Sequence, residues 1–280
     1  MTTNTTLVLG GTGKTGRRVA RRLTDLGLPV RIGSRSVEPP FDWENQATWK
    51  PALRDIDAVY ISYYPDIAVP GAADTVQAFV DVAVASGVRR LVLLAGRGEE
   101  SADLAEEAVR NADAEWTVVR PAFFNQNFSE SFLVEPLVDG EVVLPVGDVG
   151  EPFIDADDIA EVAVAALTAT GHVGRTYELT GPRLLTFADA VAEIAAASGR
   201  EIRFTPVSVE AYAAMLTEQE VPDDFVWLLT FLFTEVMDGR NAHLGDGVQR
   251  ALGRAPKDFG DYARETAATG VWSASAAWAA

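Results

Sequence analysis

Seven residues near the start of the chain are spaced for binding a phosphate group. Gly10 is followed by Gly11-Thr12-Gly13-Lys14-Thr15-Gly16, which matches the pattern G-x-G-x-x-G. Glycine allows a tight turn and lets the backbone approach a pyrophosphate closely, and a helix N-terminus presents free N–H groups to its charge. The motif follows an apolar strand pattern at 6–9 and precedes a helical pattern, which is the context that a dinucleotide site requires. We predict that residues 10–16 bind the pyrophosphate of a dinucleotide.

The same residues also resemble the end of a loop that binds nucleoside triphosphates, because Gly13-Lys14-Thr15 is its usual ending. That loop needs a further glycine five residues before Gly13, and Val8 stands there. The triphosphate interpretation is therefore excluded. A dinucleotide site or a purely structural glycine turn remains.

The residues after the second expected strand indicate which dinucleotide is bound. A site for NAD usually has an acid there, about twenty residues after the glycines, which binds the ribose 2′-hydroxyl. This chain has Gly33-Ser34-Arg35-Ser36 instead. An arginine pairs with a 2′-phosphate through two hydrogen bonds, whereas an acid repels it. We therefore predict NADP(H) as the cofactor, with Ser34 and Arg35 at the 2′-phosphate; the alternative is that Arg35 only faces solvent.

The side chains that usually supply a proton in such enzymes are missing. A tyrosine followed four residues later by a lysine is the common pair, but Lys14, Lys50 and Lys257 follow Gly10, Gln46 and Gly253 at that spacing. The two histidines, His172 and His243, form no metal-binding or Ser-His-Asp pattern, and there is no cysteine. Three acids, Asp155, Asp157 and Asp158, could hold a cation, although helix capping explains them more simply.

The absence of this pair restricts the reaction. Reduction of an ordinary ketone creates an alkoxide that needs a proton donor. An iminium needs only hydride, and a quinone or activated alkene needs weak acid help, which water or Arg97 could supply. We predict an NADPH-dependent oxidoreductase that passes hydride to a small apolar acceptor: a quinone, an iminium or a conjugated carbonyl. The alternative is a non-catalytic NADP(H)-binding redox sensor or regulatory protein.

Strand and helix patterns alternate along the first part of the chain. Apolar strands are expected at 6–9, 30–32, 58–61, 90–94 and 116–119, with helices at 74–85 and 102–111 between them. This alternation is typical of an α/β fold, a Rossmann doubly wound parallel sheet. A helix at 156–168 and a strand at 176–179 complete the pattern.

A smaller, mostly helical C-terminal substrate lobe is expected after this domain. Its helix at 186–198 opens with a capping box formed by Thr186 and Asp189. We assign residues 1–180 to the NADP(H)-binding domain, with 123–141 contributing to the substrate lobe. The lobe itself is 181–272 and the tail 273–280. The most apolar segment, 225–237, is too short to span a membrane and is expected to form a buried helix.

Composition restricts the partners and the location. The net charge is −18, which opposes binding to a nucleic acid. Only the first 50 residues have more basic than acidic side chains, and most of the arginines at 17, 18, 21 and 22 are expected to form a solvated helix face. Residues 1–9 have no signal-peptide pattern, so we expect a cytoplasmic protein without membrane contact. The oligomeric state is left open.

Further stretches resemble the NmrA-like, atypical short-chain dehydrogenase family over nearly the whole chain. Besides residues 10–16, these stretches are Phe41-Asp-Trp43, Thr48-Trp49, Asp57–Tyr60, Leu94-Ala-Gly-Arg-Gly-Glu-Glu100, Trp116–Pro121, Asn125–Phe128, Phe153–Asp155, Leu179–Pro182 and Asp238–Asn241. Within the family, the pattern is similar to NAD(P)H:quinone oxidoreductases and to festuclavine dehydrogenase-like enzymes, which reduce an iminium. The family also contains redox-sensing regulators.

The resemblance implies positions for the other cofactor contacts. It places Asp42 and Trp43 near the adenine. Along the cofactor it places Ser62, Tyr63, Tyr64 and Pro65, and around the nicotinamide Ala95, Gly96, Arg97, Pro121, Phe123 and Phe124. The aromatic residues that follow the fifth strand could wall a substrate pocket or form ordinary core, and we expect Phe124, Asn127 and Phe128 at the substrate.

Overall fold

The computed structural model describes residues 5–273 and divides into two compact units. The first unit contains the chain up to Pro121, together with Ala156–Leu179 and Gly245–Ala255. The second contains Ala122–Asp155, Thr180–Leu244 and the chain from Pro256 onwards. Apart from Ser273, the tail predicted at 273–280 lies outside the described residues.

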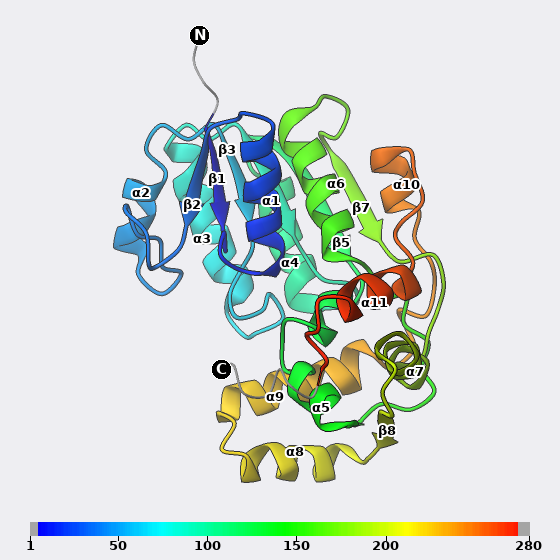
Figure 1. Ribbon diagram of the computed structural model, residues 1–280. Helices are drawn as coiled ribbons and strands as arrows, with labels where there is room; N and C mark the ends of the chain where they lie inside the picture. Colours follow the sequence, from blue (N-terminus) through cyan, green and yellow to red (C-terminus); the bar gives the residue numbers. More distant parts are fainter. Residues whose placement is uncertain (1–4, 274–280) are drawn as a thin grey trace. The chain divides into compact units, whose positions relative to one another are not determined.

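A parallel sheet of six strands forms the centre of the first unit (Figure 1). Its order is β2-β1-β3-β4-β5-β7, and every neighbouring pair is parallel. The strands are β1 (Thr6–Leu9), β2 (Val30–Gly33), β3 (Ala58–Ile61), β4 (Arg90–Leu94), β5 (Glu115–Pro121) and β7 (Arg175–Leu179). The predicted doubly wound parallel sheet is confirmed, and the strand order reverses between β1 and β3, where such sheets bind their ligands.

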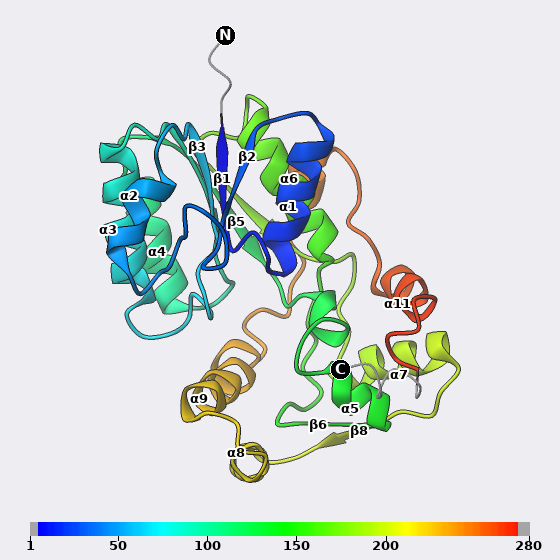
Figure 2. The ribbon, with the colours of Figure 1, turned by 60° about the vertical axis from the view of Figure 1, so that its left-hand side comes forward.

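Helices cover both faces of this sheet. Figure 2 shows α1 (Lys14–Asp25) and α6 (Ala156–Thr168) on one face. On the other face lie α2 (Trp49–Ala52), α3 (Ala72–Ala85) and α4 (Glu100–Arg110). Strands β1 and β3 are buried along their whole length, as expected for strands with helices on both sides. The last helix of the unit, α10 (Gly247–Leu252), packs against β7 and α6.

The second unit is mostly helical, as predicted, with a small parallel pair formed by β6 (Glu141–Leu144) and β8 (Arg203–Pro206). Its helices are α5 (Val134–Asp139), α7 (Phe187–Ser198), α8 (Val209–Glu218), α9 (Asp223–Phe231) and α11 (Phe259–Ala267). The predicted capping box is present at the start of α7, where Thr186 and Asp189 bond to each other's backbone N–H.

The division into two units differs in part from the expected boundary at residue 180, and the second unit includes the stretch 123–141 that we assign to the substrate lobe. Residues 122–155 belong to the second unit because Phe128, Leu137 and Val142 pack in its apolar core. Residues 245–255 belong to the first unit, since α10 packs against β7.

The apolar segment 225–237 forms α9 and a π-helix at Leu232–Val236. Phe225 and Trp227 on this segment are 39% and 41% exposed, so the expectation of a wholly buried helix is wrong. Leu228, Leu229 and Phe233 supply the buried face. In the range 5–273, no helix is both long and apolar enough to cross a bilayer.

Candidate functional site

The glycine-rich loop between β1 and α1 is a turn that side chains would disrupt. Gly10 has a φ of +61°, and its carbonyl accepts a hydrogen bond from the N–H of Gly13 at 2.8 Å. A Cβ on Gly11 would lie 2.8 Å from Cγ2 of Ile32. A Cβ on Gly16 would collide with the Gly10 carbonyl. Three glycines of the predicted motif are therefore required by the backbone itself.

The start of α1 is suited to an anion. Its N-cap is Gly13, which has no side chain to bond the first N–H groups, and its first turn has no acidic residue. Thr12 and Gly13 are exposed. Free N–H groups and the helix dipole both favour a negative charge at such a position. The turn and the helix start together form a phosphate cradle at the carboxyl end of β1.

Arg35 lies beside this edge of the sheet, just after β2. Its guanidinium lies over the ring of Tyr64, 5.8 Å from the centroid, and both side chains are exposed. The hydroxyl of Ser34 is 3.1 Å from that of Ser36. The arginine thus packs against an aromatic ring and keeps its hydrogen-bonding edge available.

Trp43 connects the segment after β2 to the end of β3. Its indole N–H donates to the carbonyl of Ser62 at 3.3 Å, and its ring lies 4.9 Å from that of Tyr63. Phe79 packs against it edge-on. Asp42 uses its carbonyl to accept from the indole of Trp49 at 2.8 Å. Trp43 is buried, so it supports Ser62 and Tyr63 from the interior of the first unit.

Ser62 lies beside the phosphate cradle. A Cβ on Gly10 would be 3.3 Å from its hydroxyl oxygen. The predicted residues 62–64 thus extend from the glycine loop toward Arg35.

Arg97 follows β4 and is 3% exposed. Its guanidinium lies 3.8 Å from the carboxylate of Glu178. An ion-paired guanidinium does not give up its proton in a protein. We had considered Arg97 as a source of weak acid help, and its position argues against that role. Ala95 is also buried, with its N–H bonded to the carbonyl of Val119.

Arg97 adjoins a network of charges on β5, β7 and α4. Glu106 is 0% exposed and receives hydrogen bonds from Arg110 and Arg120. Arg120 also approaches Glu178, at 3.6 Å. A buried carboxylate is tolerated when such partners neutralise it, so we interpret this network as a support for the edge of the sheet.

Sequence reasoning missed two carboxyl groups at this edge. Glu99 follows β4, and Asp66 follows β3. Burial and the neighbouring Asp66 and Asp103 raise the pKa of Glu99 to about 8. Burial also raises the pKa of Asp66, against the opposing effects of the Ala68 N–H and of Lys14. Glu99 lies just before α4, where an acid in a sequence looks like an ordinary helix cap, so the sequence signal was ambiguous.

The aromatic residues after β5 belong to the second unit, beginning beyond Pro121. Phe128 is 0% exposed, and its ring lies 5.5 Å from those of Phe153 and Phe259. Its carbonyl accepts from the Trp272 indole at 2.7 Å. The expectation that Phe128 faces a substrate is therefore corrected, because this side chain is sealed in the core. Phe123, Phe124 and Asn127 are half-buried.

The three acids near the start of α6 serve as ion-pair and hydrogen-bond partners. Asp157 receives a hydrogen bond from Arg22 at 2.8 Å, and Asp158 one from Arg254 at 2.6 Å. Asp155 accepts from Gln126 at 3.1 Å. Among the described residues, no cluster of three His, Cys, Asp or Glu is arranged to hold a metal ion. Arg22 is thus paired to α6 and is not part of a free basic face.

His172 has a structural role. Its Nδ1 lies 2.9 Å from the Tyr177 hydroxyl, and its carbonyl accepts from Thr117. Burial and the nearby charge of Arg90 lower its pKa. These contacts connect the loop before β7 to β5.

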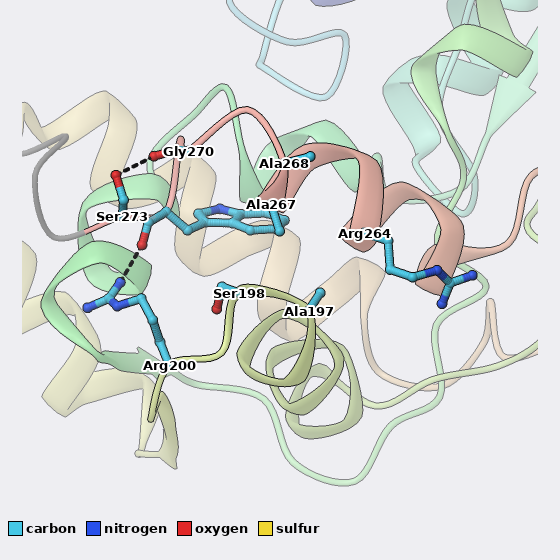
Figure 3. A pocket seen from close by; sticks show the side chains of 9 residues that line it. Ala197, Ser198, Arg200, Arg264, Ala267, Ala268, Gly270 and Ser273 are labelled. Atoms are coloured by element: carbon cyan, nitrogen blue, oxygen red, sulfur yellow. Dashed lines mark hydrogen bonds between the residues drawn. The ribbon is translucent and has the colours of Figure 1, made fainter.

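A cavity of about 540 Å³ lies in the second unit (Figure 3). None of the predicted site residues lines it, although Trp272 in its wall donates a hydrogen bond to the carbonyl of Phe128. Small residues of α7 and α11 line it, together with Arg200 and Trp272. The Arg200 guanidinium is occupied by backbone carbonyls, donating to Leu137 at 2.9 Å and to Trp272 at 2.6 Å. Arg200 therefore ties the C-terminal segment to α5 and is not arranged to bind a ligand.

Comparison with known proteins agrees with the phosphate cradle. The profile of a family described as NAD(P)H-binding matches residues 10–170, which is more than half of the chain. The chain belongs to this NAD(P)H-binding family. The match begins at Gly10, the first residue of the cradle.

Several relatives of this chain have the names of reductases or dehydrogenases. The chain is 32% identical to festuclavine dehydrogenase of Aspergillus fumigatus, covering 93% of this chain and 97% of the relative. It is 29% identical to the NAD(P)H azoreductase of Xenophilus azovorans, covering 94% and 98%. The triphenylmethane reductase of Citrobacter sp., solved with NADP(H), has the same fold, with a TM-score of 0.72, 19% identity, and coverage of 95% and 99%.

These matches confirm the predicted resemblance to the NmrA-like, atypical short-chain dehydrogenase group. The chain is an NAD(P)H-dependent oxidoreductase.

Proposed function

We propose that this oxidoreductase uses NADPH and transfers its hydride to a small apolar acceptor. The observation that carries the proposal is Arg35, which stands where an NAD site has an acid. It lies beside Tyr64 and keeps its charge exposed. The planar guanidinium of Arg35 could donate two hydrogen bonds to a 2′-phosphate next to the phosphate cradle.

The first unit suggests how the cofactor is held. The pyrophosphate would lie on residues 10–16, and the 2′-phosphate at Ser34 and Arg35. The remaining contacts proposed in this unit are Asp42, Ser62, Tyr63, Tyr64, Ala95, Gly96, Arg97 and Pro121. Trp43 acts by supporting Ser62 and Tyr63. In the second unit, Phe123 stays a proposed cofactor contact, and Phe124 and Asn127 stay proposed substrate contacts.

The acceptor is proposed to be a quinone, an iminium or a conjugated carbonyl. Relatives bear the names of enzymes for a clavine and for azo compounds, which supports a small organic acceptor. An iminium or another carbocation-like acceptor becomes neutral on receiving hydride and takes up no proton. A quinone or an azo bond takes up one proton with the hydride, so the two classes make different demands on the protein.

Oxidation of NADPH, followed at the nicotinamide absorbance band, tests the proposal. The acceptors would be a benzoquinone, an azo dye, a cyclic iminium, an enone and a simple ketone, with NADH in parallel. We expect turnover of the benzoquinone, the cyclic iminium or the enone, and preference for NADPH; the azo dye is included because a relative has the name of an azoreductase. Tight binding of NADPH with no turnover of any acceptor would contradict it and would favour the redox sensor.

A further inference from the structure

Three ionisable side chains lie next to one another at the carboxyl edge of the sheet. They follow β1, β3 and β4, which are neighbours in the sheet. Lys14 starts the helix after the glycine loop, and its charge acts on Asp66. Asp66 in turn acts on Glu99. The row thus leads from the phosphate cradle to the residues after β4.

The carboxyl group of Glu99 lies directly on the backbone of Gly96. A Cβ on Gly96 would collide with it, so a larger residue at 96 would displace this carboxyl group from its position. Glu99 is 8% exposed, and its Oε2 is buried without a hydrogen-bond partner among the described residues. It occupies the N-cap position of α4, yet its side chain does not cap the helix.

An acid in this position is stable when it carries its proton. Burial penalises the carboxylate, and the acids Asp66 and Asp103 oppose a second negative charge. Arg120 approaches Asp103 at 3.3 Å, and Lys14 faces Asp66. The positive charges thus act on the neighbouring acids, and the surroundings of Glu99 favour its protonated form.

We propose that Glu99 is the proton donor for acceptors that take up a proton with the hydride. This rests on the proposed function. The C4–H bond of NADPH breaks with both electrons, and the hydride bonds to one atom of the acceptor. The O–H bond of Glu99 breaks, and its proton bonds to the acceptor's oxygen or nitrogen. NADP⁺ and the reduced acceptor result, and the Glu99 carboxylate takes a proton from water.

Other polar groups of the first unit are less suited to this role. The Tyr60 hydroxyl is buried beside Thr15, and burial raises its pKa. Arg97 is ion-paired to Glu178. His172 lies before β7, at the opposite edge of the sheet from the glycine loop, and contacts Tyr177. Glu99 combines burial, an unpartnered oxygen and a place at the edge where the cradle lies.

The test compares Glu99→Gln with Glu100→Gln, an exposed neighbour on α4. Each variant is assayed with NADPH and two acceptors: an azo dye, which needs a proton, and a cationic triarylmethane dye, which needs only hydride. For Glu99→Gln we expect kcat with the azo dye to fall about 10²-fold, with the KM for NADPH unchanged. The rate with the cationic dye should stay within about twofold of the wild type, and Glu100→Gln should behave as the wild type.

The pH profile provides a second readout. A donor must carry its proton, so wild-type kcat with the azo dye should fall as the pH rises through about 8. Glu99→Gln should lack this decline. The infrared carbonyl band of a protonated acid should be present in the wild type at neutral pH and absent from the variant, whichever dye is turned over.

The outcomes separate the two proposals. Equal losses with both dyes, or no loss with either, would overturn the role of Glu99 and leave the oxidoreductase proposal intact. No NADPH oxidation by the wild type with any acceptor would overturn both. If the wild type lacked the carbonyl band at neutral pH, this result alone would show that Glu99 is not protonated.

Discussion

The guanidinium of Arg35 lies over the ring of Tyr64, 5.8 Å from its centroid. One residue follows β2 and the other follows β3, so the contact joins the strands on both sides of β1. A cation–π contact of this kind attracts the guanidinium to the ring without using its N–H donors. This pair holds a positive charge in place beside the phosphate cradle.

Replacing Arg35 should change the choice of cofactor. For Arg35→Glu we expect the ratio of kcat/KM for NADPH to that for NADH to fall about 10- to 100-fold. A hydrogen bond to a charged group contributes about 1.5–3 kcal/mol, and each 1.4 kcal/mol is a factor of ten. Steady-state kinetics with NADPH and with NADH measures this ratio of kcat/KM values. The exposed Arg54→Glu serves as control, and an unchanged ratio in Arg35→Glu would place the 2′-phosphate elsewhere.

A methyl group on Gly11 should damage both the loop and the fold. Its Cβ would lie 2.8 Å from Ile32 Cγ2 and 2.9 Å from the Val8 carbonyl. Overpacking of this kind costs about 1–3 kcal/mol, so Gly11→Ala should lower Tm and weaken NADPH binding. Gly147→Ala is the control, because no atom lies within 4 Å of its added Cβ. Thermal unfolding measures the loss of stability, and a fluorescence titration measures the affinity for NADPH. Normal NADPH binding by Gly11→Ala would argue against the cradle.

Neutralising Glu106 should destabilise the first unit. The carboxylate is buried between Arg110 and Arg120. Removing one partner of a buried ion pair costs about 3–5 kcal/mol. We expect Glu106→Gln to shift the urea midpoint of unfolding downwards, while Glu107→Gln, exposed on the same helix, leaves it unchanged. Equal midpoints for the two variants would mean that the network adds little to stability.

The raised pKa of Glu99 also predicts how stability depends on pH. Its pKa is about 8 in the folded protein, above the ordinary 4.5. The folded state therefore binds the proton more tightly than the unfolded chain, and this contribution is complete below the ordinary pKa and is lost as the pH rises through about 8. Asp66 shifts in the same direction. Between pH 5 and pH 8.5, Tm of Glu99→Gln should fall less than that of the wild type; parallel curves would contradict the shift.

Local patterns predicted the parts of this molecule that depend on neighbours in the sequence. Gly11 and Gly16 could be recognised because a tight turn needs glycine, whatever surrounds it. The capping box of Thr186 and Asp189 was recognisable because its partners are three residues apart. The parallel sheet followed from alternating strand and helix patterns.

Features that depend on distant residues could not be predicted in this way. In the sequence, Glu99 looks like an ordinary helix cap, because the neighbouring Asp66 comes from the loop after β3, far from it along the chain. From the sequence, Phe128 could line a pocket or fill a core. Its packing against Phe153 and Phe259, which are distant in the sequence, shows that it belongs to the core. The exposure of Phe225 and Trp227 could not be predicted, because an apolar composition does not reveal which face of a helix packs against the rest of the protein.

The helix α10 has a consequence for dissecting the protein. It lies against β7, the last strand in the order of the sheet, and a Cβ on Gly245 or Gly247 would press on the Glu178 carbonyl of that strand. A fragment ending at residue 180 would lose this cover and leave an outer strand free to pair with another molecule. A soluble cofactor-binding fragment would therefore require residues 245–255 to be joined back onto the chain after β7.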